Sequence, residues 1–177
     1  MIEKKIVNLR SFKQRVKHNK SKFRRFLSKL ENKPPKGLPV LINHLEREVW
    51  HEVDCLSCAG CCKTMTPTYT EKDIKRIAAY LGETPDQFKS IRLRREKGGD
   101  RDWLNKAEPC QFLDLKTNMC SIYEVRPADC AGFPHLSKKM KDYAHVHKQN
   151  IECCPATYKL VEKMMLHLNH PSDKHSL

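Results

Sequence analysis

The apolar residues of the first 33 positions repeat at the spacing of an α-helix. Seven of them form one stripe: Ile2, Ile6, Leu9, Val16, Phe23, Leu27 and Leu30. Lys13 and Lys20 occupy two further positions of the same stripe and interrupt it in the middle. Pro34 and Pro35 come next, and proline cannot continue a helix. The pattern predicts a basic amphipathic helix over residues 1–33, followed by a linker at 34–37.

Later segments carry further helix signals. Apolar residues at helical spacing predict a helix over 39–50. Thr70 is a favourable N-cap and Gly82 is favourable just beyond a helix C-terminus, so a helix is expected between them. Pro85 and Pro155 each suit the first position of a helix. We expect these two helices to end near residues 91 and 168.

The segments between these helices lack helical periodicity. Residues 51–69 are predicted to form a loop, and residues 94–106, which contain two adjacent glycines, a mobile loop. Residues 110–122 are predicted to form a β-hairpin with its turn at 114–118. A short helical turn is expected at 123–125. The predicted fold class is mainly α: a small domain of short helices with one β-hairpin, preceded by the basic amphipathic helix.

Positive charge is concentrated in the N-terminal arm. The chain of 177 residues has a formal net charge of +13, and residues 1–50 alone carry 14 Lys/Arg against four Asp/Glu. Three interpretations of residues 1–37 stay open. The arm could contact the phosphates of a nucleic acid or another acidic partner, or pack as an ordinary amphipathic helix on its own domain or on a partner. It could also lie on an acidic membrane surface, in which case the inserted residues would be Phe12, Phe23, Phe26 and Leu27.

The chain shows no membrane-spanning or secretory signal. No run approaches the roughly 18 apolar residues of a membrane span, and no apolar signal-peptide core is present near the start. We therefore expect a cytoplasmic protein whose thiols stay reduced. Only 39% of the residues are hydrophobic, so cross-links would help a modest core. Three parts are expected: an arm and linker at 1–37, a cysteine-cluster metal-binding domain at 38–170 and a flexible tail at 171–177.

Cysteine is the residue type that stands out most. All nine lie between positions 55 and 154: Cys55, Cys58, Cys61, Cys62, Cys110, Cys120, Cys130, Cys153 and Cys154. An odd number cannot pair entirely as disulfides, and clustered cysteines in a reducing compartment more often bind metal. The first four have the spacing Cys-x2-Cys-x2-Cys-Cys, whose two-residue gaps let thiolates converge on one centre. All nine are therefore candidate metal ligands.

Two vicinal pairs, at 61–62 and 153–154, indicate more than one binding site. Neighbouring side chains diverge by roughly 100° in a helix and point to opposite faces of a strand. One vicinal pair is therefore not expected to bind a single ion together. We hypothesise that Cys55, Cys58 and Cys61 share one centre, completed by a distal cysteine. A second centre or a redox pair would use others among the remaining six.

The spacing bears on which metal is bound. Thiolates suit zinc and iron–sulfur clusters alike. The two-residue gaps and the later Cys154-Pro155 pair resemble bacterial ferredoxins, which favours an iron–sulfur cluster such as 4Fe–4S over zinc. His135 and His51 are weaker candidate ligands, whereas His147 is expected at the surface.

The motif residues resemble a known family. The chain has Cys55-x2-Cys58-x2-Cys61-Cys62, then Cys110-x-Phe112-Leu113, then Cys120-x-Ile122-Tyr123-x2-Arg126-Pro127-x2-Cys130-x2-Phe133-Pro134. This combination resembles the YkgJ-type cysteine-cluster family, also described as the CxxCxxCC zinc- or iron-chelating domain, over roughly residues 50–156. It is also similar to the Cys-rich part of flagellin lysine methylase, which is associated with an iron–sulfur cluster. The resemblance implies metal chelation, and the basic arm lies outside it.

The other motif residues suggest supporting roles around a metal. Arg126 could donate hydrogen bonds toward cluster sulfurs or pair with an acid, or be a surface arginine before a turn. Phe133 and Phe112 could shield the centre from water, or simply pack in the core. Pro127 would fix the turn that aims Cys130.

Three functions stay open from the sequence. The first is a metal-binding protein that chelates an iron–sulfur cluster or zinc through a multi-Cys site. The second is an iron–sulfur-dependent redox enzyme or a protein- or tRNA-modifying enzyme. The third is a zinc-stapled module that binds nucleic acid or a protein partner. The chain has no P-loop, GxGxxG, HExxH or GxSxG motif, so its sequence does not decide whether it is an enzyme.

Overall fold

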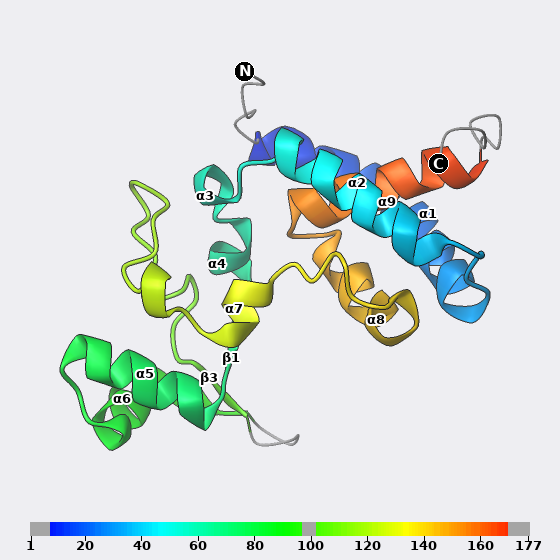
Figure 1. The fold of residues 1–177 in the computed structure, drawn as a ribbon. Helices are drawn as coiled ribbons and strands as arrows, with labels where there is room; N and C mark the ends of the chain where they lie inside the picture. Colours follow the sequence, from blue (N-terminus) through cyan, green and yellow to red (C-terminus); the bar gives the residue numbers. More distant parts are fainter. Residues whose placement is uncertain (1–7, 97–101, 170–177) are drawn as a thin grey trace. The chain divides into compact units, whose positions relative to one another are not determined.

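The computed structural model describes residues 8–96 and 102–169 (Figure 1). Expectations for Ile2, Ile6, the adjacent glycines at 98–99 and the tail at 171–177 lie outside these residues. The chain divides into two compact units: Met1–Cys58 together with Pro134–Leu177 (unit 1), and Ala59–Phe133 (unit 2). Helices dominate the described residues, and the sheet is small, so the mainly α fold class is confirmed.

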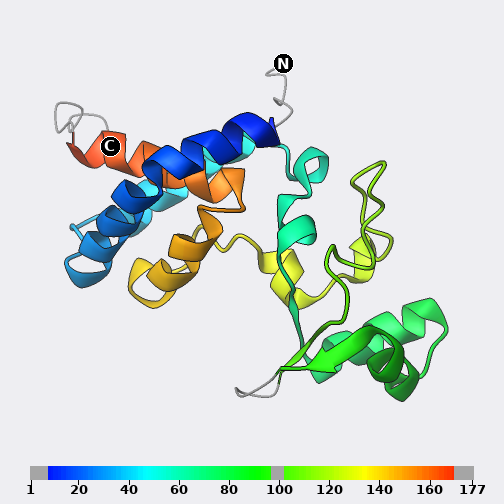
Figure 2. The ribbon, with the colours of Figure 1, turned by 180° about the vertical axis from the view of Figure 1, so that it is seen from behind.

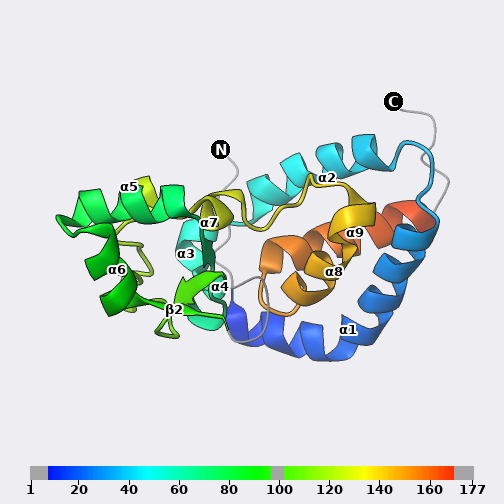
Figure 3. The same cartoon turned by 90° about the horizontal axis from the view of Figure 1, so that it is seen from below.

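Unit 1 is a helical layer structure. It contains α1 (Leu9–Asn32), α2 (Leu38–Glu52), α3 (Cys55–Cys58), α8 (Met140–Asn150) and α9 (Pro155–Asn169). Helix α1 packs on α8 and α9, and α2 packs on α9 from the other side. Figure 2 shows α1 lying across α8 and α9, and Figure 3 shows α8 and α9 between α1 and α2.

The predicted basic helix is confirmed over its described residues, and it packs on its own unit. Asn8 caps α1 by accepting a hydrogen bond from the Ser11 N–H at 3.0 Å. Its apolar stripe is buried: Phe12, Val16, Phe23, Leu27 and Leu30. Each such side chain contributes roughly 1.5–3 kcal/mol when buried, against less than about 1 kcal/mol for an exposed ion pair. Apolar packing therefore holds the helix in place.

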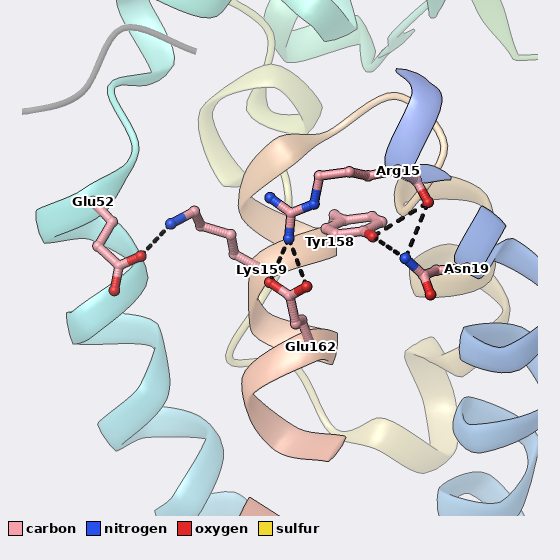
Figure 4. A network of polar contacts seen from close by, with 6 residues as sticks. All are labelled: Arg15, Asn19, Glu52, Tyr158, Lys159 and Glu162. Atoms are coloured by element: carbon pink, nitrogen blue, oxygen red, sulfur yellow. Dashed lines mark hydrogen bonds and ion pairs between the residues drawn. The ribbon is translucent and has the colours of Figure 1, made fainter. Parts of the chain in front are cut away.

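Tyr158 of α9 is the centre of this packing (Figure 4). Its ring lies 5.6 Å from that of Phe12 and 4.8 Å from that of Phe23, between centroids. The Asn19 side-chain amide donates to the Tyr158 hydroxyl at 2.8 Å, and Arg15 donates to both carboxylate oxygens of Glu162 at 2.6 and 2.8 Å. The burial of Phe12, Phe23 and Leu27 leaves none of these three for insertion into a membrane.

Unit 2 combines short helices with a three-stranded antiparallel sheet. Its helices are α4 (Gly60–Thr64), α5 (Glu71–Leu81), α6 (Pro85–Arg92), the 3-10 turn η1 (Tyr123–Val125) and α7 (Ala128–Gly132). The strands β1 (Thr68–Tyr69), β2 (Leu93–Arg95) and β3 (Trp103–Asn105) have the order β1-β3-β2. Leu104 pairs with Thr68 on one side and Arg94 on the other. The buried core comprises Tyr69, Ile74, Ile77, Ala78, Phe88, Leu93, Phe112 and Ile122.

Helix α5 forms where the sequence predicts it. Thr70 and Asp73 make a reciprocal capping box, in which each side chain bonds the backbone N–H of the other residue at 3.1 Å. Gly82 ends the helix with φ of +70°, a conformation that favours glycine. The helices that begin at Pro85 and Pro155 and the turn at 123–125 are likewise confirmed.

Three segments differ from expectation. The predicted loop at 51–69 contains α3, α4 and β1. The predicted loop at 94–106 contains the last two residues of β2 and all of β3. Elements of two to five residues are too short to show a period in the sequence, which explains these errors. Within 110–122 the hairpin reduces to a single antiparallel bridge between Leu113 and Cys120.

His147 is the clearest error in predicted exposure. It is only 1% exposed on α8, and both ring nitrogens are without a hydrogen-bond partner among the described residues. Burial, with His135 and His145 nearby, lowers its pKa to about 4, so the ring is neutral at physiological pH.

Within the described ranges, no helix is both long enough and apolar enough to cross a lipid bilayer.

Candidate metal centre

Four cysteines of unit 2 gather in one region, and we call them the four-thiol group: Cys62, Cys110, Cys120 and Cys130. Cys62 lies in α4 and Cys130 in α7, while the other two lie in the segment between β3 and η1. The Cys110 N–H donates to the Cys62 carbonyl at 2.8 Å, which ties that segment to α4. The bridge between Leu113 and Cys120 then brings the ends of the turn together. None of the four is in a disulfide.

The four thiols influence one another electrostatically. Burial raises the pKa of Cys130 to about 12, with smaller contributions from Cys62, Asp129, Cys110 and Cys120. Burial is also the main cause of the raised pKa of Cys110 and of Cys120. Cys62 is the exception, because its hydrogen bond with Cys61 and the nearby Lys63 lower its pKa to about 7. Cys62 is therefore the thiol of the group that ionises first near neutral pH.

A buried relay of hydrogen bonds reaches one sulfur of the group. The Asn105 side-chain amide donates to the Cys110 sulfur at 3.2 Å, and the Tyr69 hydroxyl donates to the Asn105 carbonyl oxygen at 2.6 Å. Asn105 and Tyr69 are 1% and 4% exposed. Burial, with Cys110, Cys130 and Cys120 nearby, raises the pKa of Tyr69, so its hydroxyl stays a donor. Tyr69 lies opposite Trp103 in the pairing of β1 with β3, so Tyr69 and Asn105 come from neighbouring strands.

Helix α7, which carries Cys130, is held by two carboxylates. Asp73 is buried and accepts from the Ala128 N–H at 3.1 Å, from the Thr70 hydroxyl at 2.6 Å and from Arg76 at 2.7 Å. Asp129 accepts from the Thr68 N–H at 3.1 Å, which joins α7 to β1. Asp73 therefore caps α5 and fixes the start of α7 with one side chain.

Unit 1 has its own smaller gathering, Cys58, Cys153 and Cys154, which we call the three-thiol group. Burial raises the pKa of Cys153 to about 12, with Cys154, Glu152 and Cys58 nearby. Burial likewise raises the pKa of Cys154, and Cys58 raises it further. The Cys154 N–H and the Cys153 thiol both donate to the Asn150 carbonyl, at 2.7 and 3.7 Å. This turn leads into α9.

The remaining candidate residues from the sequence lie outside the two thiol groups. Cys55 is exposed in α3. The Cys61 and Cys62 sulfurs lie 3.9 Å apart, close to the ~3.8 Å between two thiolates on one tetrahedral zinc, so the expected divergence of this pair is not seen. Arg126 donates to the Tyr123 carbonyl at 2.7 Å and stacks on the Tyr123 ring. Its positive charge partly offsets the effect of burial, which raises the pKa of Cys120. Phe133 follows α7 and is half-buried.

Pro127 lies at the turn before α7, and Phe112 packs in the core of unit 2. Pro127 is the N-cap residue of α7, and its carbonyl accepts from Ala131 at 2.9 Å. Phe112 is 4% exposed and stacks on Phe88 in the core of unit 2, with 6.3 Å between ring centroids. Phe112 therefore belongs to the packing core that adjoins the four-thiol group.

Three supporting residues were missed by sequence reasoning. Tyr69 and Asn105 lie in strands too short to be recognised, so nothing in the sequence marks them. Asp73 was identified only as an acidic residue in the first turn of a helix. Its contact with Ala128 joins residues 55 positions apart and has no local signal.

The described side chains do not form a finished metal site. No three Cys, His, Asp or Glu side chains among residues 8–96 and 102–169 already surround a common point where an ion could be held. The donor chemistry nevertheless fits a thiophilic metal, because four cysteines equal the ligand number of closed zinc sites and of common iron–sulfur clusters.

Comparison with known proteins bears on the same residues. The uncharacterized protein MJ0661 of Methanocaldococcus jannaschii is 37% identical over 81 residues, which cover 46% of this chain and 43% of that protein. The chain thus spans less than half the length of this relative. No solved structure matches the chain. Residues 54–154, more than half of the chain, match the CxxCxxCC family, described as "Putative zinc- or iron-chelating domain". This range includes every cysteine of both thiol groups, and the chain belongs to the CxxCxxCC family.

Proposed function

We propose that this protein is a metal-chelating protein whose principal centre is the four-thiol group of unit 2. The observation that carries the proposal is the mutual proximity of Cys62, Cys110, Cys120 and Cys130, which come from three separate segments. The three-thiol group of unit 1 would form a second, incomplete set. A centre built on Cys55, Cys58 and Cys61 is the alternative grouping, and the same variants test it.

The thiols must ionise and turn toward one another when metal binds. Buried thiols are costly to ionise alone, but a bound cation reverses this preference and holds them as thiolates. The Asn105 amide, which donates to the Cys110 sulfur, would stabilise the charge that this thiolate gains. Arg126 would act in the same sense on Cys120 through its charge.

An iron–sulfur cluster is our first candidate for the metal, with zinc as the alternative. The ferredoxin-like gaps between the first cysteines favour the cluster, which would supply electron transfer when bound. Zinc held by four cysteines would be structural instead. The alternative function, an iron–sulfur-dependent redox or modifying enzyme, requires that a cluster be found. The cytoplasmic location also remains a prediction.

Metal counting on single-cysteine variants tests the proposal. Protein purified without oxygen would be measured for iron, zinc and acid-labile sulfide per chain. Cys62→Ser and Cys130→Ser each remove one member of the four-thiol group, and we expect both variants to lose the metal of unit 2. Cys55→Ser is the control, because Cys55 is exposed and lies in unit 1, and it should retain that metal.

Circular dichroism of each variant would show that its helices persist. Equal loss of the unit 2 metal in C55S and C62S would contradict the grouping, since Cys55 lies in unit 1. Full metal content in both C62S and C130S would contradict the proposed centre itself. Iron with sulfide would identify a cluster, and zinc alone would identify a closed thiolate site.

Asn105 provides a second test at the same centre. Asn105→Leu keeps the size of the side chain but removes the amide that donates to the Cys110 sulfur. We expect metal affinity to fall about 10- to 100-fold, the usual cost of losing a partner of a ligand. Tyr69→Phe is the matched control, because it removes the hydrogen bond that Asn105 accepts from Tyr69 and keeps the one that Asn105 donates to sulfur. Competition with a chromophoric chelator would measure both, and an equal loss in Y69F would contradict this role.

A further inference from the structure

We propose that the solvent-facing side of α1 binds the phosphodiester backbone of a nucleic acid. Helix α1 contains nine Lys/Arg residues. Three of them, Arg15, Lys20 and Arg24, form ion pairs with Glu162 and Glu152 of unit 1. The other six, which we call the outer basic face, are Arg10, Lys13, Lys17, Lys22, Arg25 and Lys29.

The outer basic face has no acidic neighbour to neutralise it. All six residues are exposed. In the part of the chain that the structure describes, no ion pair joins any of them to an acid. The single acidic residue of α1, Glu31, forms an ion pair with Lys148 of α8 at 2.6 Å. The face therefore consists of two positive clusters on the solvent side of the helix, Arg10–Lys13–Lys17 and Lys22–Arg25–Lys29.

Packing of the helix does not explain this charge. The apolar stripe and four ion pairs, which involve Lys148, Glu152 and Glu162, already hold α1 on the rest of unit 1. Arg10, Lys13 and Lys17 are spaced by three and four residues, and Lys22, Arg25 and Lys29 repeat this spacing. Like charges at these spacings destabilise a helix by about 0.2–0.5 kcal/mol per pair. The arrangement costs stability unless an anionic partner relieves it.

The length and chemistry of the face fit a chain of phosphates. Arg10 and Lys29 are 19 positions apart, which corresponds to about 28 Å along a helix, or about eight base pairs of duplex. A membrane partner would require exposed apolar residues among the charges. The large apolar residues Phe12, Phe23 and Leu27 instead face the interior of unit 1. The face therefore fits a polyanion with regularly spaced charges.

Fluorescence anisotropy with the full chain tests this inference. The probes are a labelled DNA duplex of about 24 base pairs and the RNA duplex of the same sequence, since both carry the phosphodiester backbone. If all six residues contact phosphates, log K against log salt should have a slope of about −5 on DNA. The triple variant K17Q/K22Q/K29Q should reduce the slope to about −3 and weaken binding at 0.1 M salt about 100-fold or more.

The control is K72Q/K75Q/K116Q, which removes the same charge from three exposed lysines of unit 2. This variant should bind within about threefold of the natural chain, and both variants should keep the natural metal content. Binding to one duplex type alone would identify the kind of nucleic acid. An equal loss in the control, an unchanged salt slope in the first variant, or binding to phosphatidylserine vesicles but to neither duplex would overturn the inference.

Discussion

Removal of the metal is expected to unfold unit 2 while the helices of unit 1 stay folded. Unit 2 spans Ala59–Phe133, and its strands are only two or three residues long. A unit of this size rarely gains more than about 3–5 kcal/mol from a single hydrophobic core. Structural metal in small domains can contribute about 10–16 kcal/mol of apparent binding free energy. Loss of the metal would therefore remove more free energy than the core supplies.

Unit 1 should respond differently, because long helices support it. Tyr158 and Leu27 are buried to 2% and 0% exposure between α1 and α9, independently of any thiol. Lys159 and Lys163 of α9 are paired with acids of α2. Two members of the three-thiol group, Cys153 and Cys154, directly precede α9, and Cys58 lies in α3. We expect α1, α2 and the body of α9 to keep most of their amide protection.

The two tryptophans allow each unit to be followed separately. Trp50 lies in α2 of unit 1 and Trp103 in β3 of unit 2. In a W50F background, chelator should lower the urea midpoint reported by Trp103 or abolish the transition. In a W103F background, the transition reported by Trp50 should shift by much less. C110S/C130S is the control, since chelator should change nothing further in it, and an unmoved Trp103 transition would contradict the prediction.

Helices with local signals could be predicted from the sequence, whereas the thiol groups could not. Helix α5 was located correctly because Thr70, Asp73 and Gly82 mark its ends within twelve positions. Helix α9 was located by Pro155 and the apolar residues that follow it. In these cases the determining contacts are close in sequence. Residue type and spacing therefore carried enough information.

The grouping of cysteines depends instead on tertiary contacts. Cys58 and Cys62 are four positions apart, yet they lie in different units with different partners. Cys62 meets Cys110 through a backbone hydrogen bond across 48 positions. The sequence motif identified which residues are candidate ligands, but spacing alone suggested a centre on the first three cysteines. Only the positions of α4 and α7 within unit 2 separate the alternatives.

Asp73 illustrates how a residue with a local role can also organise the site. Asp73→Ala is expected to destabilise unit 2 by about 3 kcal/mol or more. Loss of the capping box costs about 1 kcal/mol, and the Ala128 N–H left without its acceptor adds about 1–3 kcal/mol. Arg76 also loses its carboxylate partner at 2.7 Å. Because the contact of Asp73 with the start of α7 is lost, Cys130 should also bind metal more weakly.

Urea unfolding of the metal-loaded W50F protein, followed through Trp103, would measure this effect. Asp86→Ala is the matched control, because Asp86 is also in the first turn of a helix of unit 2 but is exposed. It should cost no more than about 0.5 kcal/mol. A thiol-alkylation time course should show faster labelling of Cys130 in D73A than in D86A. A loss of only about 1 kcal/mol in D73A, with labelling of Cys130 equal to that in D86A, would mean that Asp73 acts only as a helix cap and does not position Cys130.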